Sequence, residues 1–252
     1  MNFDISHILE QWDYQSGQVI VRKFKGKDGV ERLQLRVDLG LLQMNAQGRP
    51  DGKHPFGHES LFEHYQQQLE KHRAAHEGSD EGFQLKIEDC SKLQQEAIQY
   101  HHRYICLFQL EDYDAVLRDT DRNLRVFNFV QQYAASEDLS WAMQQFRPQL
   151  MLMRIRAQGT MALKRDDFDG ALKAIEEATE ELRNFYRESG RTELADNSPE
   201  IHSLEMWQQD LQEKRPLSER EQLEIELDEA VQNEDYEKAA QVRDALRKIK
   251  TT

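Results

Sequence analysis

The chain has 252 residues and a formal net charge of −14, with 38% hydrophobic and 32% charged residues. This balance, with few prolines and glycines, is typical of a water-soluble, mainly helical protein of one or two domains. No apolar run is long enough for a membrane span, and the first residues do not resemble a secretory signal, so we expect a cytoplasmic protein. The negative charge disfavours nucleic acid as a partner unless basic residues are segregated from it.

A small β-module is expected near the N-terminus. Apolar residues alternate with polar ones at Leu33, Leu35, Val37 and Leu39. This period of two predicts a half-buried strand. The pair Asp28-Gly29 favours a tight turn, which would set Val19–Lys25 against Arg32–Asp38 as a two-stranded hairpin. The apolar phase shifts after this strand, which indicates a bulge at Gly40.

Basic residues are concentrated on this predicted hairpin. They are Arg22, Lys23, Lys25, Lys27, Arg32 and Arg36. One interpretation is contact with an acidic partner or a phosphate backbone. The other is an edge strand protected by charge against pairing with another chain. The sequence leaves both open.

A loop rich in glycine and proline is expected over residues 45–57, followed by a helix from Ser60 to Ala75. Ser60 and Glu63 have the spacing of a capping box, in which each side chain bonds the other's backbone N–H. Residues 78–82 read as a linker, so we place a domain boundary near residue 80.

Five histidines lie in this region, at His54, His58, His64, His72 and His76. They are interpreted as solvated polar residues or, alternatively, as part of a ligand-binding loop. No acidic or thiol ligand completes a metal set at recognisable spacing, so no metal or other cofactor is expected. No catalytic motif is found, and no catalytic residue is assigned.

The rest of the chain has the periodicity of helices. The expected ranges are 89–110, 113–134, 137–146, 148–165, 168–188 and 200–214. Pro148 separates two of them because proline cannot donate the helical hydrogen bond. Cys90 and Cys106 lie on one predicted helix, on roughly opposite faces, and are expected to be buried reduced thiols.

A short acidic and aromatic motif recurs between helices. Its copies are Glu111-Asp112-Tyr113-Asp114, Asp166-Asp167-Phe168-Asp169 and Glu234-Asp235-Tyr236-Glu237. Each is predicted to join two antiparallel helices, as in proteins built from stacked helix pairs. The middle pair resembles a tetratricopeptide repeat at Ile155, Gly159, Ala162, Ala171, Ile175 and Ala178. Small residues at such positions allow helices to cross closely.

The C-terminal residues 219–250 predict a helical hairpin. Ser218 and Glu221 form a second capping-box pattern at its start. The first helix has an apolar stripe at Leu223, Leu227, Ala230 and Val231, and the second at Ala239, Val242, Leu246 and Ile249. Asn233 is expected to end the first helix in the left-handed conformation, and Asp235 to cap the second. We expect Tyr236 to reach back onto the first helix.

This hairpin resembles the UVR motif, which is shared by the B and C subunits of the bacterial UvrABC excision nuclease and by regulators that act with Clp unfoldases. The matching residues are Leu223, Leu227, Ala230, Tyr236, Glu237, Ala239, Ala240, Arg243, Asp244 and Leu246. The resemblance implies a protein-docking hairpin. The expected partner-binding residues are Leu223, Ile225, Leu227, Tyr236, Ala239, Ala240, Arg243 and Leu246. The partner would be another protein or a second copy of this chain.

The sequence therefore predicts a mainly α fold of tetratricopeptide-like antiparallel helix pairs, with an N-terminal β-hairpin module and a C-terminal UVR hairpin. The expected divisions are 1–80, 83–190, 198–216 and 217–252. The first functional hypothesis is a non-enzymatic adaptor that docks a protein partner. The alternative is a nucleic-acid-associated factor of the excision-repair type that uses the basic hairpin.

Overall fold

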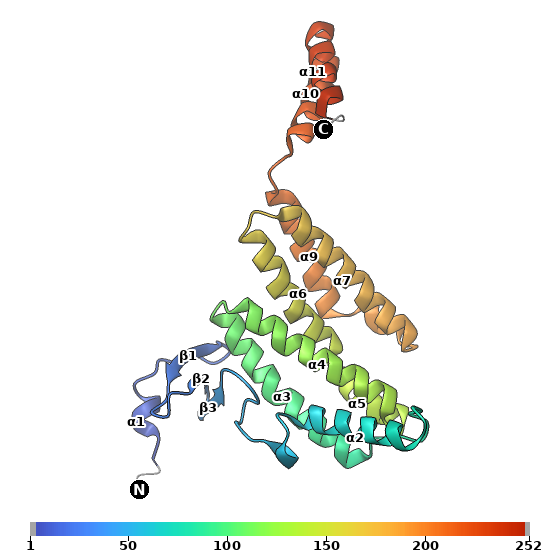
Figure 1. Ribbon diagram of the computed structural model, residues 1–252. Coiled ribbons are helices and arrows are strands. Elements are labelled where there is room, and N and C mark those ends of the chain that lie inside the picture. Colours follow the sequence, from blue (N-terminus) through green and yellow to red (C-terminus); the bar gives the residue numbers. More distant parts are fainter. Residues whose placement is uncertain (1–3, 250–252) are drawn as a thin grey trace. The chain divides into compact units, whose positions relative to one another are not determined.

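The computed structural model describes residues 4–249, and the chain divides into two compact units, Met1–Met206 and Trp207–Thr252. The fold is mainly helical, with a small N-terminal sheet and a C-terminal helix pair, as expected (Figure 1). The first unit contains α1 (Ser6–Leu9), β1 (Ile20–Lys25), β2 (Glu31–Val37), β3 (Gly40–Asn45), η1 (Pro55–Gly57), α2 (Leu61–Ala75), α3 (Ile87–Gln109), α4 (Tyr113–Tyr133), α5 (Glu137–Gln144), α6 (Arg147–Leu163), α7 (Phe168–Glu188), α8 (Thr192–Asp196) and the start of α9 (Pro199–Lys214). The second unit contains the end of α9, α10 (Glu219–Gln232) and α11 (Tyr236–Ile249).

The N-terminal sheet has three antiparallel strands in the order β1-β2-β3, where two strands were expected. The first turn lies where Asp28-Gly29 predicts it, with Gly29 in the left-handed region at φ +80°. The expected bulge at Gly40 is wrong. The chain turns at Asp38-Leu39 and Gly40 begins β3, opposite Val37. Leu39 therefore lies at the tip of a turn and is 94% exposed. The alternating pattern predicted instead that it faces the core.

The third strand changes the environment of β2. It makes β2 the central strand, and both of its faces are covered: Leu33 and Leu35 are buried, and so are Gln34 and Arg36. Gln34 accepts a hydrogen bond from Arg22 on β1 and donates one to Gln43 on β3. Polar side chains on this face are buried because they bond across the sheet, which alternation along one strand cannot predict.

Several helices begin at residues whose side chains cap them. The hydroxyl of Ser60 accepts from the N–H of Glu63 at 3.1 Å, and that of Ser136 accepts from Leu139 at 3.4 Å. Pro148 is the second residue of α6, where its missing N–H costs no helical bond. The predicted helix ranges agree with the structure within two residues at each end, which is the usual scatter of helix boundaries.

The recurring acidic motif forms the same turn three times. Glu111, Asp166 and Glu234 all have φ +58°, an uncommon left-handed conformation for residues other than glycine. In each turn the next residue is an aspartate. The backbone N–H groups of Asp112, Asp167 and Asp235 return to carbonyl groups of the preceding helices at 2.9, 3.0 and 2.8 Å. Their side chains then cap α4, α7 and α11. The same turn thus ends one helix and begins its antiparallel neighbour.

Helix pairs α3/α4 and α6/α7 pack side by side in the first unit, and α4 also packs against α6 (Figure 1). The α6/α7 contact uses the small and apolar positions that resemble a tetratricopeptide repeat: Ile155, Gly159, Ala171, Ile175 and Ala178 are buried, and Ala162 is half-buried. The helix pairing is as expected. The resemblance to a particular repeat family stays a prediction.

One hydrophobic cluster crosses the boundary predicted near residue 80. It includes Leu33 and Met44 of the sheet, Leu69 of α2, and Leu93 and Val126 of α3 and α4. Because these side chains share one core, residues 1–80 and 83–190 belong to the same compact unit. The four-part division of the sequence stays a prediction about which segments fold independently.

Cys90 and Cys106 are buried free thiols, as expected. Burial raises the pKa of Cys106 to about 12, because the charged thiolate is disfavoured in an apolar environment. No helix within residues 4–249 combines the length and apolar character that a bilayer crossing requires.

Candidate functional site

The C-terminal hairpin begins with the predicted capping box. The N–H of Ser218 donates to the Glu221 carboxylate at 2.8 Å, and the N–H of Glu221 donates to the Ser218 hydroxyl at 3.2 Å. Arg215 forms an ion pair with the same carboxylate. These hydrogen bonds, first those from Ser218 and then that from Arg215, lower the pKa of Glu221 to about 2. The start of α10 therefore holds Glu221 in its charged form.

The turn between the two helices differs from the expected one by a single residue. Asn233 has φ −87°, and Glu234 is the left-handed residue. Asp235 caps α11 as predicted, since its carboxylate accepts from the N–H of Lys238 at 3.1 Å. Tyr236 is 70% exposed, so the expectation that it packs back onto the first helix is wrong. At the first position of α11, its side chain points to solvent.

The apolar stripes of the two helices form a narrow contact. Ala230, Ala239 and Val242 are buried. Leu223, Leu227, Ala240 and Leu246 are half-buried. Val231 is exposed, so the prediction that it belongs to the apolar stripe of α10 is wrong. The side chain of Ile249 lies outside the described residues. Lys238 on α11 forms an ion pair with Glu226 on α10 at 2.9 Å, at the surface.

The predicted partner-binding residues thus divide into two groups. Leu223, Leu227, Ala239, Ala240 and Leu246 hold the two helices together. Ile225, Tyr236 and Arg243 face solvent, with Ile225 46% exposed. The second group is the more exposed of the two.

The family model described as the UvrB/uvrC motif matches residues 218–252, which contain this hairpin. The resemblance stated from the sequence is therefore confirmed for the C-terminal segment. No curated protein and no solved structure matches the chain. The motif occurs in excision-repair proteins and in adaptors, so the match alone does not separate the two hypotheses.

The basic residues of the N-terminal hairpin are mostly engaged within the sheet. Arg22 bonds Gln34 and lies over the Trp12 ring at 4.2 Å, and Lys23 pairs with Glu31 at 3.0 Å. Arg32 pairs with Asp28.

Arg36 is the most enclosed of these bases. It is buried and donates to the carbonyl groups of Val37, Asp38 and Gly40, beside the Tyr14 ring. Among the described residues, Lys25 and Lys27 have no ion-pair partner and are exposed. The six bases therefore do not form one open cationic surface.

Four of the five histidines of the N-terminal region lie in two separate groups. His72 stacks on His76 with ring centroids 4.0 Å apart. His64 stacks on Phe56 at 4.3 Å, with His58 beside it. No cluster of three potential metal-ligating side chains occurs within the part of the chain that the structure describes.

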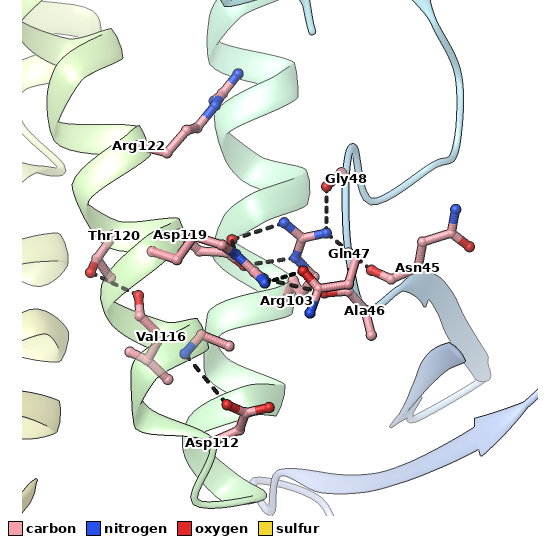
Figure 2. A network of polar contacts seen from close by, with 12 residues as sticks. Asn45, Ala46, Gln47, Gly48, Arg103, Asp112, Val116, Asp119, Thr120 and Arg122 are labelled. Carbon is pink, nitrogen blue, oxygen red and sulfur yellow. Dashed lines mark hydrogen bonds and ion pairs between the residues drawn. The ribbon is translucent and has the colours of Figure 1, made fainter. Parts of the chain in front are cut away.

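A network of buried charged residues was missed from the sequence. Arg103 on α3 and Asp119 on α4 are each 1% exposed and form two hydrogen bonds, at 2.7 and 2.8 Å. Figure 2 shows the Arg103 guanidinium between Asp119 and the loop after β3, where it also donates to the carbonyl groups of Asn45 and Gly48. Arg118 joins the same aspartate to Gln47. The network fixes the loop after the sheet onto α3 and α4.

A second buried carboxylate, Glu96, lies on α3. Its oxygens accept from the backbone N–H groups of Leu61 and Phe62 at the start of α2. Arg122 and Arg49 contact the same carboxylate. The signal for these residues was present in the sequence, since Glu96 and Arg103 fall on the buried stripe of α3. A charged residue at a position on the apolar, core-facing stripe of a helix indicates a buried ion pair, because charges are rarely buried without a partner.

Proposed function

We propose that this protein is a non-enzymatic adaptor of the cytoplasm that docks a protein partner through its C-terminal hairpin. The observation that carries this proposal is the match of residues 218–252 to the UvrB/uvrC motif, on a hairpin that exposes Ile225 and Tyr236. A hairpin of two helices with a narrow contact has too small a core to be stable alone. A further surface, from another protein or a second copy of the chain, would add the missing apolar contact.

The helical body is proposed as the second docking element, with tetratricopeptide-like packing of its helix pairs. Its support is the repeated left-handed turn at Glu111 and Asp166 and the small residues between α6 and α7. Catalysis is not part of the proposal, since the sequence offers no catalytic motif. Nucleic acid is disfavoured as a partner by the net charge of −14 and by the internal pairing of Arg22, Arg32 and Arg36.

The test is a deletion of 217–252 compared with the full chain. We expect the deletion to abolish capture of the partner from native lysate and to remove only the helicity of the deleted residues. The capping box at Ser218 and the Pro216 break mark the start of a separate segment, so the residues before it should fold without the hairpin. A truncated chain that still captured the partner would contradict docking through the hairpin. Salt-sensitive retention of the full chain on DNA would favour the repair hypothesis.

A further inference from the structure

A hollow with an apolar wall in the first unit is not used by the proposed docking function. It lies between α3, α4, the end of α5 and the start of α6 (Figure 1), and its volume is about 170 Å³. The apolar part of its wall consists of Ile98, Phe127, Met143, Phe146 and Leu150. We call it the apolar hollow. Ile98 and Phe146 are each 47% exposed, so they mark its open side.

The apolar hollow is uncharged, although 32% of the residues in the chain are charged. Among the described residues, those that line it include no lysine, arginine, aspartate or glutamate. Its histidine, His101, is neutral at pH 7, because burial, with a smaller contribution from His102, lowers its pKa to about 4. By contrast, five glutamates line a larger hollow between α4, α6 and α7. A charged group would lose hydration in the apolar hollow without gaining a partner, so a neutral occupant is favoured.

The size and the lining of the hollow favour a single aromatic ring. An apolar cavity of about 150 Å³ can hold one benzene ring, whereas sites for larger small molecules usually measure about 300–1,000 Å³. The rings of Tyr104, Phe127 and Phe146 line the hollow, and so does the side chain of Met143. Rings pack favourably edge to face against one another, and a methionine sulfur packs favourably at a ring edge. An aromatic occupant therefore gains contacts that an aliphatic one of the same size lacks.

A polar pair in the wall can bond a ligand. The Nδ1 atom of His101 lies 2.6 Å from the Tyr104 hydroxyl group, so one of the two donates to the other. Whichever donates, the pair keeps one donor and at least one acceptor. Neither side chain makes another hydrogen bond in the part of the chain that the structure describes. The Asn123 amide, by contrast, is used at both ends, since it donates to the Ala97 carbonyl group and accepts from Arg122.

We propose that the apolar hollow binds a neutral compound with one aromatic ring and one hydroxyl group. The ring lies among Phe127, Met143 and Phe146, and the hydroxyl group bonds the pair of His101 and Tyr104. Burial of the ring supplies most of the affinity, and the hydrogen bond fixes the orientation of the ligand. This site belongs to the first unit, so the proposal does not depend on docking by the hairpin.

The experiment is a titration of the full chain with para-cresol, followed by calorimetry and by NMR of isotope-labelled methionine methyl groups. We expect saturable binding of one molecule per chain, with a dissociation constant below about 1 mM. The methyl resonance that is missing in Met143→Leu belongs to Met143 and should shift on titration of the parent chain. Absence of saturable binding, or an unchanged Met143 resonance in a saturated sample, overturns the proposal.

Related probes test the chemistry of the site. Para-toluate, an anion of similar shape, should bind about tenfold more weakly than para-cresol or worse, because the hollow offers no partner for its charge. His101→Phe keeps a ring at this position and removes the hydrogen bond. It should weaken para-cresol about fivefold relative to toluene, which lacks the hydroxyl group. Equal binding of para-toluate and para-cresol, or an unchanged preference over toluene in both His101→Phe and Tyr104→Phe, contradicts the proposal.

Phe146→Ala tests the place of binding, because Phe146 lines the hollow and is exposed, so that its loss leaves the core of the first unit intact. Loss of its ring should weaken para-cresol about fivefold. Ile98→Ala removes the other exposed side chain of the wall and should act in the same direction. Phe56→Ala is the matched control, since Phe56 is also exposed and lies outside the hollow. If Phe146→Ala and Phe56→Ala had equal effects, para-cresol would bind elsewhere and the assignment would be wrong.

Discussion

The two units of this protein use charged residues in opposite ways. In the first unit, Arg103 and Asp119 pair at 1% exposure and hold a loop against two helices. In the hairpin, the pairs of Lys238 with Glu226 and Arg220 with Glu224 lie at the surface, with each side chain at least two-fifths exposed. Buried pairs fix position because breaking one leaves an uncompensated charge, whereas exposed pairs contribute little.

The apolar residues show the same contrast. The first unit buries large side chains such as Leu93, Val126 and Ile175 in its interior. The hairpin buries mainly Ala230, Ala239 and Val242, which offer little apolar area. The hairpin therefore has a smaller apolar core than the first unit, as the proposed docking role predicts.

Asp119→Asn should have the largest effect on this comparison. It keeps the shape of the side chain but leaves Arg103 buried beside a neutral group. We expect the first unit to lose about 3–5 kcal/mol of unfolding free energy. Urea denaturation followed by circular dichroism measures the loss, and hydrogen exchange should find the amides of α10 and α11 unchanged.

Asp121→Asn on the same helix is the matched control. Asp121 is about half exposed and pairs with Arg154 at 2.6 Å. The same chemical change there should cost less than about 1 kcal/mol. If the two variants were equally stable, the buried pair would not define the fold of the first unit, and the contrast with the hairpin would be lost.

Ile225→Glu tests the hairpin. Because Ile225 is 46% exposed and lies off the stripe between the helices, the fold of residues 1–215 should not change. Partner binding or self-association should weaken by about 2 kcal/mol, the free energy of exposing an aliphatic side chain that the complex buries. Analytical ultracentrifugation measures self-association, and partner capture measures partner binding.

Gln241→Glu adds the same charge at an exposed position of α11 and serves as the control. It should bind and sediment like the parent. Identical behaviour of Ile225→Glu and the parent would mean that this residue is not part of an interface, and docking through this face of the hairpin would be wrong.

Local signals predicted much of this structure. The capping residues Ser60 and Ser218 and the acidic turns gave the helix boundaries, because caps and turns depend on neighbours in sequence. The turn at Asp28-Gly29 was predicted for the same reason. The error at Asn233 is instructive. The left-handed residue is Glu234, at the position that Glu111 and Asp166 occupy in the other turns, so the position in the motif decides the conformation and the preference of asparagine for it does not.

Features that depend on contacts distant in sequence were missed. Leu39 fitted the alternation of a strand, but pairing of β2 with β3 places it at a turn. Arg103 meets Asp119 and the loop at Gly48 only when α3, α4 and the sheet pack together. Periodicity showed which helix positions face the core, and it could not show that charged residues there would find partners.

His101 should make the first unit sensitive to mild acid. It is mostly buried, and its Nδ1 lies 2.6 Å from the Tyr104 hydroxyl. Burial, with a smaller contribution from the charge of His102, lowers the pKa of His101 from 6.5 to about 4. The unfolded chain therefore binds a proton more readily than the folded one between these values. Stability should be full above pH 6.5 and should fall as the pH drops towards 4.

Thermal denaturation as a function of pH measures this effect. In His101→Gln the decline over that window should become shallower, while His54→Gln, which changes an exposed histidine, should leave it unchanged. If the melting temperature fell equally steeply with pH in the parent, His101→Gln and His54→Gln, the acid sensitivity would belong to other groups.

Glu221 should give the hairpin a different and smaller pH response. Its pKa is lowered from 4.5 to about 2 by hydrogen bonds from Ser218 and Arg215. Since the folded pKa is the lower one, the contribution of this carboxylate to the stability of the hairpin is present above pH 4.5 and is lost as the pH falls towards 2.

Amide hydrogen exchange in the first turn of α10 should therefore accelerate between pH 4.5 and 2. Glu221→Gln should show the faster exchange already at neutral pH, because a neutral amide accepts more weakly from Ser218 and Arg215 than the carboxylate does. Glu224→Gln, an exposed residue paired with Arg220 at 2.7 Å, removes a charge from the same helix without a capping role. If it accelerated exchange as much as Glu221→Gln, the start of the hairpin would depend on helix charge in general and not on its capping box.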